Sequence, residues 1–235
     1  MTYQPNPHFR LLCFAIIIQL LIPLPKAFSQ TPTLAGYELY KTIDKASTAM
    51  WFQVMMFSTD SGEIQKAYFC KENILAKSYK GLLHIPGSIK TEFGAVIPVE
   101  GVIMGGCSDC DELDSVYIEY GIKNIIHEAF SGCINLRGIR LPPSLENIGM
   151  KAFEGCTSLR WIELPQHLHT IQAEAFADCC NIRYCKVNWH KPIDIGSSVF
   201  KGCQLSGCTL VVPRGTRQLY EQAEGWKDFG RIIEE

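Results

Sequence analysis

Cysteines are the side chains in this sequence with the greatest capacity for chemistry. The chain contains 11 of them, and Cys107 and Cys110 form a C-x-x-C pair, a spacing typical of redox dithiols and of half a zinc site. The flanking residues lack the strand–helix–strand pattern of redox dithiols, and no second pair stands at zinc-finger spacing. A local disulfide or two free thiols is the simpler interpretation. A thiol or metal site in which Cys179, Cys180 or Cys185 joins the pair stays open as an alternative.

His167 and His169 are the other metal-ligating side chains that stand close together. They alternate on the stretch after Pro165, but no cysteine or carboxylate pattern surrounds them, so the sequence favours surface histidines. The chain also lacks a nucleophile motif, a phosphate-binding loop and a paired-carboxylate signature. We therefore expect a non-enzymatic protein with no cofactor and no metal.

The overall charge gives no indication of a nucleic-acid partner. Lys and Arg number 22 against 24 Asp and Glu, which gives a formal net charge of −2. Such a balance provides no attraction for nucleic acid or for an anionic membrane. Hydrophobic residues make up 47% of the chain, which is enough for one continuous core.

Residues 1–29 differ from the rest of the chain and have the order of a secretory signal. A polar head with His8 and Arg10 leads into an apolar run from Leu11 to Leu24, and small residues follow. The run is shorter than the roughly 20 apolar residues of a membrane span. We expect cleavage near Ser29 and export to the periplasm, the cell surface or the medium, with no stable membrane span afterwards. An uncleaved anchor is the alternative.

The elements that would position any site follow from an internal repeat. Ala129-Phe130 recurs as Ala152-Phe153 and Ala175-Phe176, a step of 23 residues each time, and Phe200 follows one step of 24 later. Cysteines keep a constant offset from these phenylalanines. The two expected structural rows consist of Phe130, Phe153, Phe176 and Phe200, and of Cys110, Cys133, Cys156, Cys179 and Cys203.

The length of the repeat predicts the fold. A period of 23 residues lies within the range of leucine-rich repeats, and Leu136 to Leu141 carries their L-x-x-I-x-L strand pattern. We therefore predict a leucine-rich-repeat solenoid of the α/β type. Each repeat adds one short strand to a parallel sheet, and the convex side is short-helical or irregular. Ile139 and Leu141 are expected to point into the core, while Gly138 and Arg140 face outward.

The cysteines of the repeat have two possible roles. Metal ligands must converge on one point, whereas a row places its members on successive repeats. Small buried thiols that donate weakly to backbone carbonyls at a bend fit a row better. The pattern therefore predicts structural cysteines.

These residues resemble the BspA-like subgroup of leucine-rich repeats, whose repeat reads A-F-x-x-C-x-x-L-x-x-I-x-L-P-x-x-L-x-x-I. The match is best in Ala129 to Ile148 and Ala152 to Ile171, whereas Cys107 stands where the family has phenylalanine. The stretch Gly81 to Ile89 is similar to the family's first strand, and Thr209 to Phe229 is similar to its closing segment. The resemblance implies a bacterial secreted or surface protein whose relatives act in adhesion.

Both ends of a solenoid expose its core unless other residues cover them. Apolar and polar residues alternate in residues 34–80 around Trp51 to Met55, which predicts an N-terminal β-hairpin cap over residues 30–80. Residues 81–212 are expected to hold the repeats. In residues 213–235, Leu219, Tyr220, Ala223 and Trp226 recur at helical spacing, which predicts a helical C-terminal cap.

The outward positions of the strands form the candidate binding surface, because Trp, Tyr and Arg are enriched among interface anchors. This strand-face patch consists of Tyr117, Arg140, Trp161, Glu163, Tyr184 and Lys186. Ordinary surface, or packing against the N-terminal cap, is the alternative explanation for its aromatic residues. Arg137, Arg160 and Arg183 also repeat with the period, either as a solvated edge or as an attraction for an acidic partner.

Three functions are compatible with these patterns. The favoured one is an exported protein-binding or adhesion module of the cell surface or periplasm, whose partner is a protein or another surface macromolecule. A thiol- or metal-binding envelope protein built on Cys107 and Cys110 is the second. A purely structural component of the envelope is the third.

Overall fold

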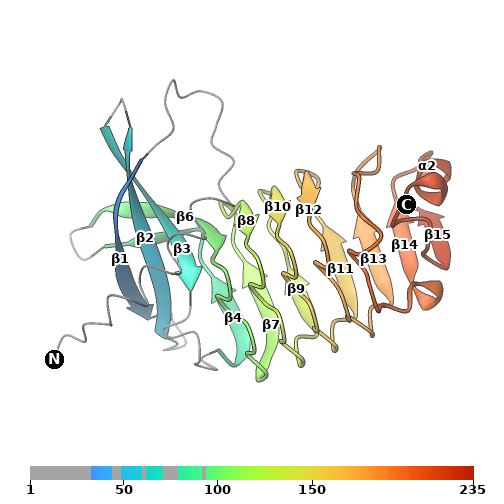
Figure 1. The fold of residues 1–235 in the computed structure, drawn as a ribbon, viewed down its shortest axis with the longest axis horizontal. Helices are drawn as coiled ribbons and strands as arrows, with labels where there is room; N and C mark the ends of the chain where they lie inside the picture. Colours follow the sequence, from blue (N-terminus) through green and yellow to red (C-terminus); the bar gives the residue numbers. More distant parts are fainter. Residues whose placement is uncertain (1–32, 44–48, 60–61, 71–78, 92–93) are drawn as a thin grey trace.

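The computed structural model describes residues 33–43, 49–59, 62–70, 79–91 and 94–235. The expected signal at residues 1–29 lies outside these ranges. The described part is an elongated stack of coils with long antiparallel strands at one end (Figure 1). Within it, no helix has the length and apolar composition needed to cross a membrane.

A parallel sheet runs along one side of the stack and confirms the predicted solenoid. Each coil contributes one strand, and neighbouring strands pair in register, with Trp161 beside both Gly138 and Tyr184. We call this the first sheet. Its strands, in spatial order, are β4 (Gly81–Ile85), β7 (Leu113–Ile118), β9 (Gly138–Arg140), β11 (Trp161–Leu164), β13 (Tyr184–Val187), β14 (Thr209–Val212) and β15 (Arg231–Glu234).

A second parallel sheet of very short strands forms another side of the coils. The sequence analysis expected this side to be short-helical or irregular, and two-residue strands separated by turns take that place. Its parallel strands are β6 (Val96–Val102), β8 (Asn124–Ile125), β10 (Asn147–Ile148) and β12 (Thr170–Ile171). The Nδ2 of Asn147 donates a hydrogen bond of 2.9 Å to the Oδ1 of Asn124, which links side chains of successive coils.

Long antiparallel strands extend this second sheet at the N-terminal end of the stack. They are β1 (Thr33–Ile43), β2 (Ala49–Thr59) and β3 (Gly62–Cys70); β3 pairs in parallel with β6, and the short β5 (Ser88–Lys90) pairs antiparallel with β6. Phe52 and Phe69 pack edge to face with ring centroids 5.4 Å apart, and both belong to the core of the solenoid. The role of these strands as a cap stays a prediction.

The phenylalanines of the repeat form one continuous stack inside the solenoid. Phe130, Phe153 and Phe176 are fully buried, and successive ring centroids lie 5.3 and 5.1 Å apart with planes within 3° of parallel. Phe200 continues the stack at 5.5 Å. The backbone supports the same register, because the N–H of Phe153 donates to the carbonyl oxygen of Ala175 on the next coil. The core is therefore held by equivalent contacts repeated from coil to coil.

The cysteines form a second row beside the phenylalanine stack. The thiol of Cys156 donates to the carbonyl oxygen of Phe130 at 3.2 Å, and Cys179 repeats this bond with Phe153 at 3.1 Å. Cys133 donates in the same way to the carbonyl oxygen of Cys107, the residue that replaces phenylalanine in the preceding coil. The weak donor of each thiol thus satisfies a buried carbonyl at the bend of the chain.

Two positions of each coil adopt the left-handed backbone region, which prevents a helix from forming there. Lys151 has φ of 58° and Gly155 has φ of 71°, and the equivalent residues of the neighbouring coils behave alike. Such residues turn the chain sharply, and only glycine adopts this region without strain. The described residues accordingly contain only two helical segments, the 3-10 turn η1 (Leu205–Gly207) and the α-helix α2 (Arg217–Gln222).

The C-terminal segment differs in part from the expected helix. The helix α2 buries Tyr220, whose hydroxyl donates to the carbonyl oxygen of Trp189 at 2.8 Å. It ends at Gln222, since Ala223 is extended and Gly225 has φ of 76°, so Trp226 packs from outside the helix. The chain then adds β15 in parallel to β14, a strand that the sequence analysis did not expect.

Candidate functional site

Two exposed aromatic side chains mark the outer surface of the first sheet. Trp161 on β11 is 45% exposed, and Tyr184 on β13 is 38% exposed. The two are direct neighbours in the parallel register, so their side chains leave the sheet side by side. Ile162, the next residue along β11, points to the opposite face and is fully buried, as the alternation of a strand requires.

A glycine on the adjacent strand makes room for Trp161. Gly138 pairs with Trp161, and a Cβ placed on Gly138 would lie 3.5 Å from the Nε1 of the indole. The indole therefore covers the glycine. The absence of a side chain at position 138 exposes this face of β9 to the tryptophan ring.

Tyr117 and Arg140 lie together towards the N-terminal end of the same surface. They pair across β7 and β9, and the guanidinium carbon of Arg140 lies 5.2 Å from the centre of the Tyr117 ring, a cation–π distance. On the other neighbouring strand, His84 pairs with Tyr117, and their ring centres lie 4.9 Å apart with the ring planes tilted by 53°. The Nε2 of His84 lies 2.8 Å from the Oε1 of Glu119.

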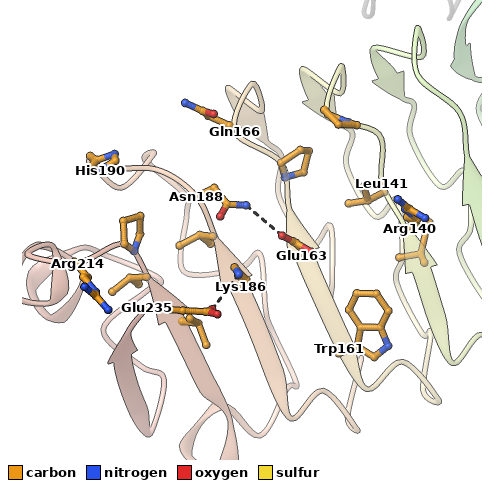
Figure 2. Close-up of a pocket in the computed structure, with 17 residues that line it drawn as sticks. Arg140, Leu141, Trp161, Glu163, Gln166, Lys186, Asn188, His190, Arg214 and Glu235 are labelled. Carbon is orange, nitrogen blue, oxygen red and sulfur yellow. Dashed lines mark hydrogen bonds and ion pairs between the residues drawn. The ribbon is translucent and has the colours of Figure 1, made fainter.

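An open groove with a volume of about 1010 Å³ extends from Arg140 to the C-terminal end of the sheet. Figure 2 shows its labelled side chains on β9, β11, β13 and the segments that follow the strands. The polar and charged lining residues are Arg140, Glu163, Gln166, Lys186, Asn188, His190, Arg214 and Glu235, and Trp161 supplies the aromatic wall.

Ion pairing fixes part of this groove. The Nζ of Lys186 lies 2.9 Å from the Oε2 of Glu235, and this hydrogen bond raises the pKa of the Lys186 ammonium. The Nδ2 of Asn188 donates to the Oε1 of Glu163 at 3.4 Å (Figure 2). Arg140 and Arg214 have no carboxylate at ion-pair distance within the described part of the chain. Cationic groups are thus available to a ligand at both ends of the groove.

The structure brings four residues of the strand-face patch together in the groove, namely Arg140, Trp161, Glu163 and Lys186. Tyr117 and Tyr184 lie on the same surface but outside the groove lining. Sequence reasoning missed Asn188, His190, Arg214 and Glu235, because none of them occupies a strand position of the 23-residue repeat. The stretch around Asn188 interrupts the repeat, which is the one signal that could have drawn attention to it.

The cysteines do not converge on a site. Cys107 and Cys110 are both fully buried. The row of thiol bonds places Cys179 three coils beyond Cys110, roughly 14 Å away at about 4.8 Å per coil. Cys180 and Cys185 belong to the same distant coil, so the structure does not join them to the C-x-x-C pair. Among the described residues, no group of three His, Cys, Asp or Glu side chains is placed to hold a metal ion.

The two histidines considered in the sequence analysis do not form a shared site. His167 is exposed, and its Nδ1 lies 3.0 Å from the carbonyl oxygen of Pro143 on the preceding coil. His169 is exposed as well. Their positions on the surface of the turn after β11 create no shared ligand site.

Comparison with one solved structure supports the fold, and two further solved structures are more distantly similar. A T. pallidum leucine-rich-repeat protein is 20% identical with a TM-score of 0.56, over 84% of this chain and 80% of that protein. The pneumococcal vaccine antigen PcpA is 14% identical with a TM-score of 0.47, over 67% and 56%. A Bacteroides capillosus leucine-rich-repeat protein is 17% identical with a TM-score of 0.44, over 57% and 93%. A search of curated proteins gives no significant match.

Family comparison agrees with the periodicity and the coil geometry. The model of the BspA-type leucine-rich-repeat region matches residues 105–223 in six copies. These copies contain the phenylalanine stack, the cysteine row and most of the groove. The chain therefore belongs to the BspA-type leucine-rich-repeat family.

Proposed function

We propose that this chain is a non-enzymatic protein-binding module that acts outside the cytoplasm, at the cell surface or in the periplasm. Residues 1–29 have the order of a secretory signal, which supports export. Membership of a family that includes many surface and secreted bacterial proteins supports the same location. Repeat solenoids present an extended surface, which suits capture of a large partner.

The observation that supports this proposal most directly is the exposure of Trp161 in the groove. Almost half of this large apolar side chain faces water, although the indole lies flat enough to cover Gly138. Removing its apolar surface from water on binding is favourable by roughly 25 cal/mol per Å². Tryptophan and arginine are also the residues most often found to dominate interface energies. Trp161 and Arg140 are therefore the proposed anchors.

The charges around these anchors favour a protein partner. The groove carries both signs, with Glu163 and Glu235 between Arg140 and Arg214. A mixed polar rim around an aromatic centre is typical of protein–protein interfaces. Adhesion through this groove, as the relatives' role implies, is the function we propose.

The test compares three variants of the full chain. Trp161→Ala and Arg140→Ala remove the proposed anchors, while Tyr120→Ala removes an aromatic side chain that is 77% exposed in the turn after β7. Immobilised protein is incubated with bacterial and host surface extracts, retained proteins are identified by mass spectrometry, and each candidate is purified and titrated.

The expected partner binds the native chain and Tyr120→Ala equally and binds each anchor variant at least about tenfold more weakly. All variants should unfold at similar denaturant concentrations, because the three side chains are exposed. A partner that binds the anchor variants as tightly as the native chain would show that the groove is not the binding site.

A further inference from the structure

Three arginines form a row along the edge of the first sheet, next to the groove but outside its lining. Arg137, Arg160 and Arg183 each stand directly before a strand, β9, β11 and β13. The N–H of Arg160 donates to the carbonyl oxygen of Arg137 at 3.4 Å, and the N–H of Arg183 donates to that of Arg160 at 2.8 Å. They therefore occupy successive coils, about 4.8 Å apart. We call this row the arginine edge.

The arginine edge has no internal counter-charge. All three side chains are exposed, and no carboxylate lies at ion-pair distance from any of them in the part of the chain that the structure describes. Arg183 donates only to backbone, with its Nη1 3.2 Å from the carbonyl oxygen of Ile182. Three like charges in a row repel one another, and an anion bound along the row would remove that repulsion.

Other charged rows of the solenoid are arranged differently. Glu174 lies between two lysines of neighbouring coils, 3.4 Å from Lys151 and 2.9 Å from Lys201. Lys123 and Glu146 pair across coils at 3.3 Å. Since the net charge of the chain is −2, a general excess of basic residues does not explain the arginine edge. On the coil before Arg137, the equivalent position is Asp114, whose carbonyl oxygen accepts from the N–H of Arg137 at 2.8 Å. The single sign is therefore confined to the three successive coils of Arg137, Arg160 and Arg183.

Aromatic side chains accompany the arginines on the neighbouring row. Trp161 follows Arg160 and Tyr184 follows Arg183, and both aromatic residues are exposed. At the C-terminal end of that row, Arg231 is exposed and pairs in register with Thr209, the neighbour of Tyr184. Exposed arginines and exposed aromatic residues thus occupy adjacent positions on successive coils of the solenoid.

We propose that the arginine edge, together with Trp161 and Tyr184, binds a linear acidic polysaccharide of the polyuronate type. Guanidinium groups bind carboxylates through two parallel hydrogen bonds. A polyuronate carries one carboxylate on each sugar ring, and one ring is about as long as a coil is thick. Because successive rings of an extended chain are turned over, carboxylates on one side recur about every two coils, which is the separation of Arg137 and Arg183. The apolar C–H faces of the rings can lie on the indole and phenol rings.

The spacing of the row argues against an extended acidic peptide. Side chains on one face of an extended peptide repeat every 6.6 to 6.8 Å or so, which matches neither one coil step of about 4.8 Å nor two such steps. Trp161 is shared with the protein-binding groove, but the three arginines are not among the residues that line it. They can therefore be replaced without changing the groove lining, which keeps the test of this inference separate from the test of the proposed function.

The experiment measures binding of oligogalacturonate to the full chain by isothermal titration calorimetry. The test variant combines Arg137→Gln, Arg160→Gln and Arg183→Gln. The matched control combines Lys123→Gln, Lys151→Gln and Lys201→Gln, which removes the same charge from other sides of the coils. Polyglutamate and neutral dextran serve as alternative ligands, and thermal melts establish that both variants are folded.

We expect the arginine variant to bind oligogalacturonate about tenfold more weakly, because three exposed charge pairs are lost. The lysine control should change the affinity by less than about twofold, since charges farther away than the screening length contribute little. Added salt should weaken the binding of the native chain more than that of the arginine variant.

Several results would overturn the proposal. Failure of the native chain to bind oligogalacturonate, or equal losses in the arginine variant and the lysine control, would remove the assigned site. Polyglutamate binding as tightly would identify the ligand as an acidic protein segment, and dextran binding as tightly would leave the arginines without a role. A further variant that combines Arg140→Gln and Lys186→Gln changes the groove alone, and a loss seen only with that variant would move the ligand to the groove.

Discussion

Phe153 and Phe176 lie face to face, with ring centroids 5.1 Å apart and ring planes 2° from parallel. They belong to consecutive coils, and each ring fills the space above the next. Parallel aromatic rings whose centroids lie this far apart are offset, and offset-stacked contacts add to the stabilisation from burial. The stack therefore sets the register of the coils, and with it the alignment of every outward-facing row.

Replacing a ring in the middle of this stack should destabilise the whole solenoid. We expect Phe153→Ala to lower the free energy of unfolding by about 3 to 5 kcal/mol, because a fully buried phenylalanine leaves a cavity between its neighbours. Urea denaturation followed by circular dichroism measures the change. Ile134→Ala, at a position that is 47% exposed, is the control and should change stability by less than about 0.5 kcal/mol. Similar midpoints for the two variants would contradict the observed register.

The left-handed positions of the turns give a prediction based on backbone strain alone. A Cβ on Gly155 would meet no atom closer than 3.8 Å, but its φ of 71° is unfavourable for alanine. We expect Gly155→Ala to lower the unfolding free energy by about 1 to 2 kcal/mol. Gly207→Ala is the matched control, since position 207 has open space and no positive φ. Chemical denaturation of both variants checks this, and a stable Gly155→Ala protein would refute the strain argument.

Alkaline pH should unfold the protein through its buried thiols. Burial raises the pKa of Cys70 to about 12, whereas an unfolded thiol has a pKa of about 8.5. The folded state therefore keeps its proton over a range in which the unfolded state loses it. The stabilisation is complete below the unfolded pKa and is lost as the pH rises towards the folded value, by at most about 1.4 kcal/mol per pH unit for each such thiol. Urea titrations between about pH 8 and about pH 11 should show this decline.

The pH dependence has an internal control. Cys70→Ala removes one buried thiol, so its stability should decline less steeply than that of the native chain over the same range. Equal slopes for the two proteins would show that Cys70 does not contribute.

Native thiol labelling should distinguish the cysteines by burial. Cys180 is half-buried, whereas its neighbour Cys179 is fully buried and donates to a backbone carbonyl. Cys203 is also half-buried, but burial raises its pKa to about 12, which keeps it protonated near neutral pH. Among the described cysteines, we expect Cys180 to react first with an aromatic disulfide reagent. Mass spectrometry of the labelled peptides, with Cys180→Ser as control, tests this order, and rapid labelling of Cys156 or Cys179 would contradict it.

The sequence predicts the repeated part of the fold well because each coil packs against its neighbours through equivalent residues. Phe130, Phe153 and Phe176 recur at one spacing and lie in one stack, so spacing alone was sufficient to place them. The outward direction of Arg140 and Trp161 follows from the alternation of the strand. Both residues accordingly face away from the core, as expected.

Features outside the repeat could not be predicted from the spacing of the repeat. Lys186 pairs with Glu235, a residue 49 positions away that reaches the groove only because β15 joins the first sheet. Arg231 to Glu234 are four residues without a repeat partner in the sequence, and nothing in their pattern specifies a parallel neighbour. Groove residues such as His190 and Arg214 depend on loops whose course is fixed by tertiary contacts.

Because each coil bonds only to the coil before and the coil after it, the solenoid can change length without being redesigned. A tandem duplication of one 23-residue unit between Phe153 and Phe176 would present the same rings and the same carbonyls at both new junctions. Recombination between units could thus lengthen or shorten the arginine edge by whole steps of about 4.8 Å. The length of the arginine edge would then evolve through the number of repeats, while the side chains on each repeat evolve separately through point mutation.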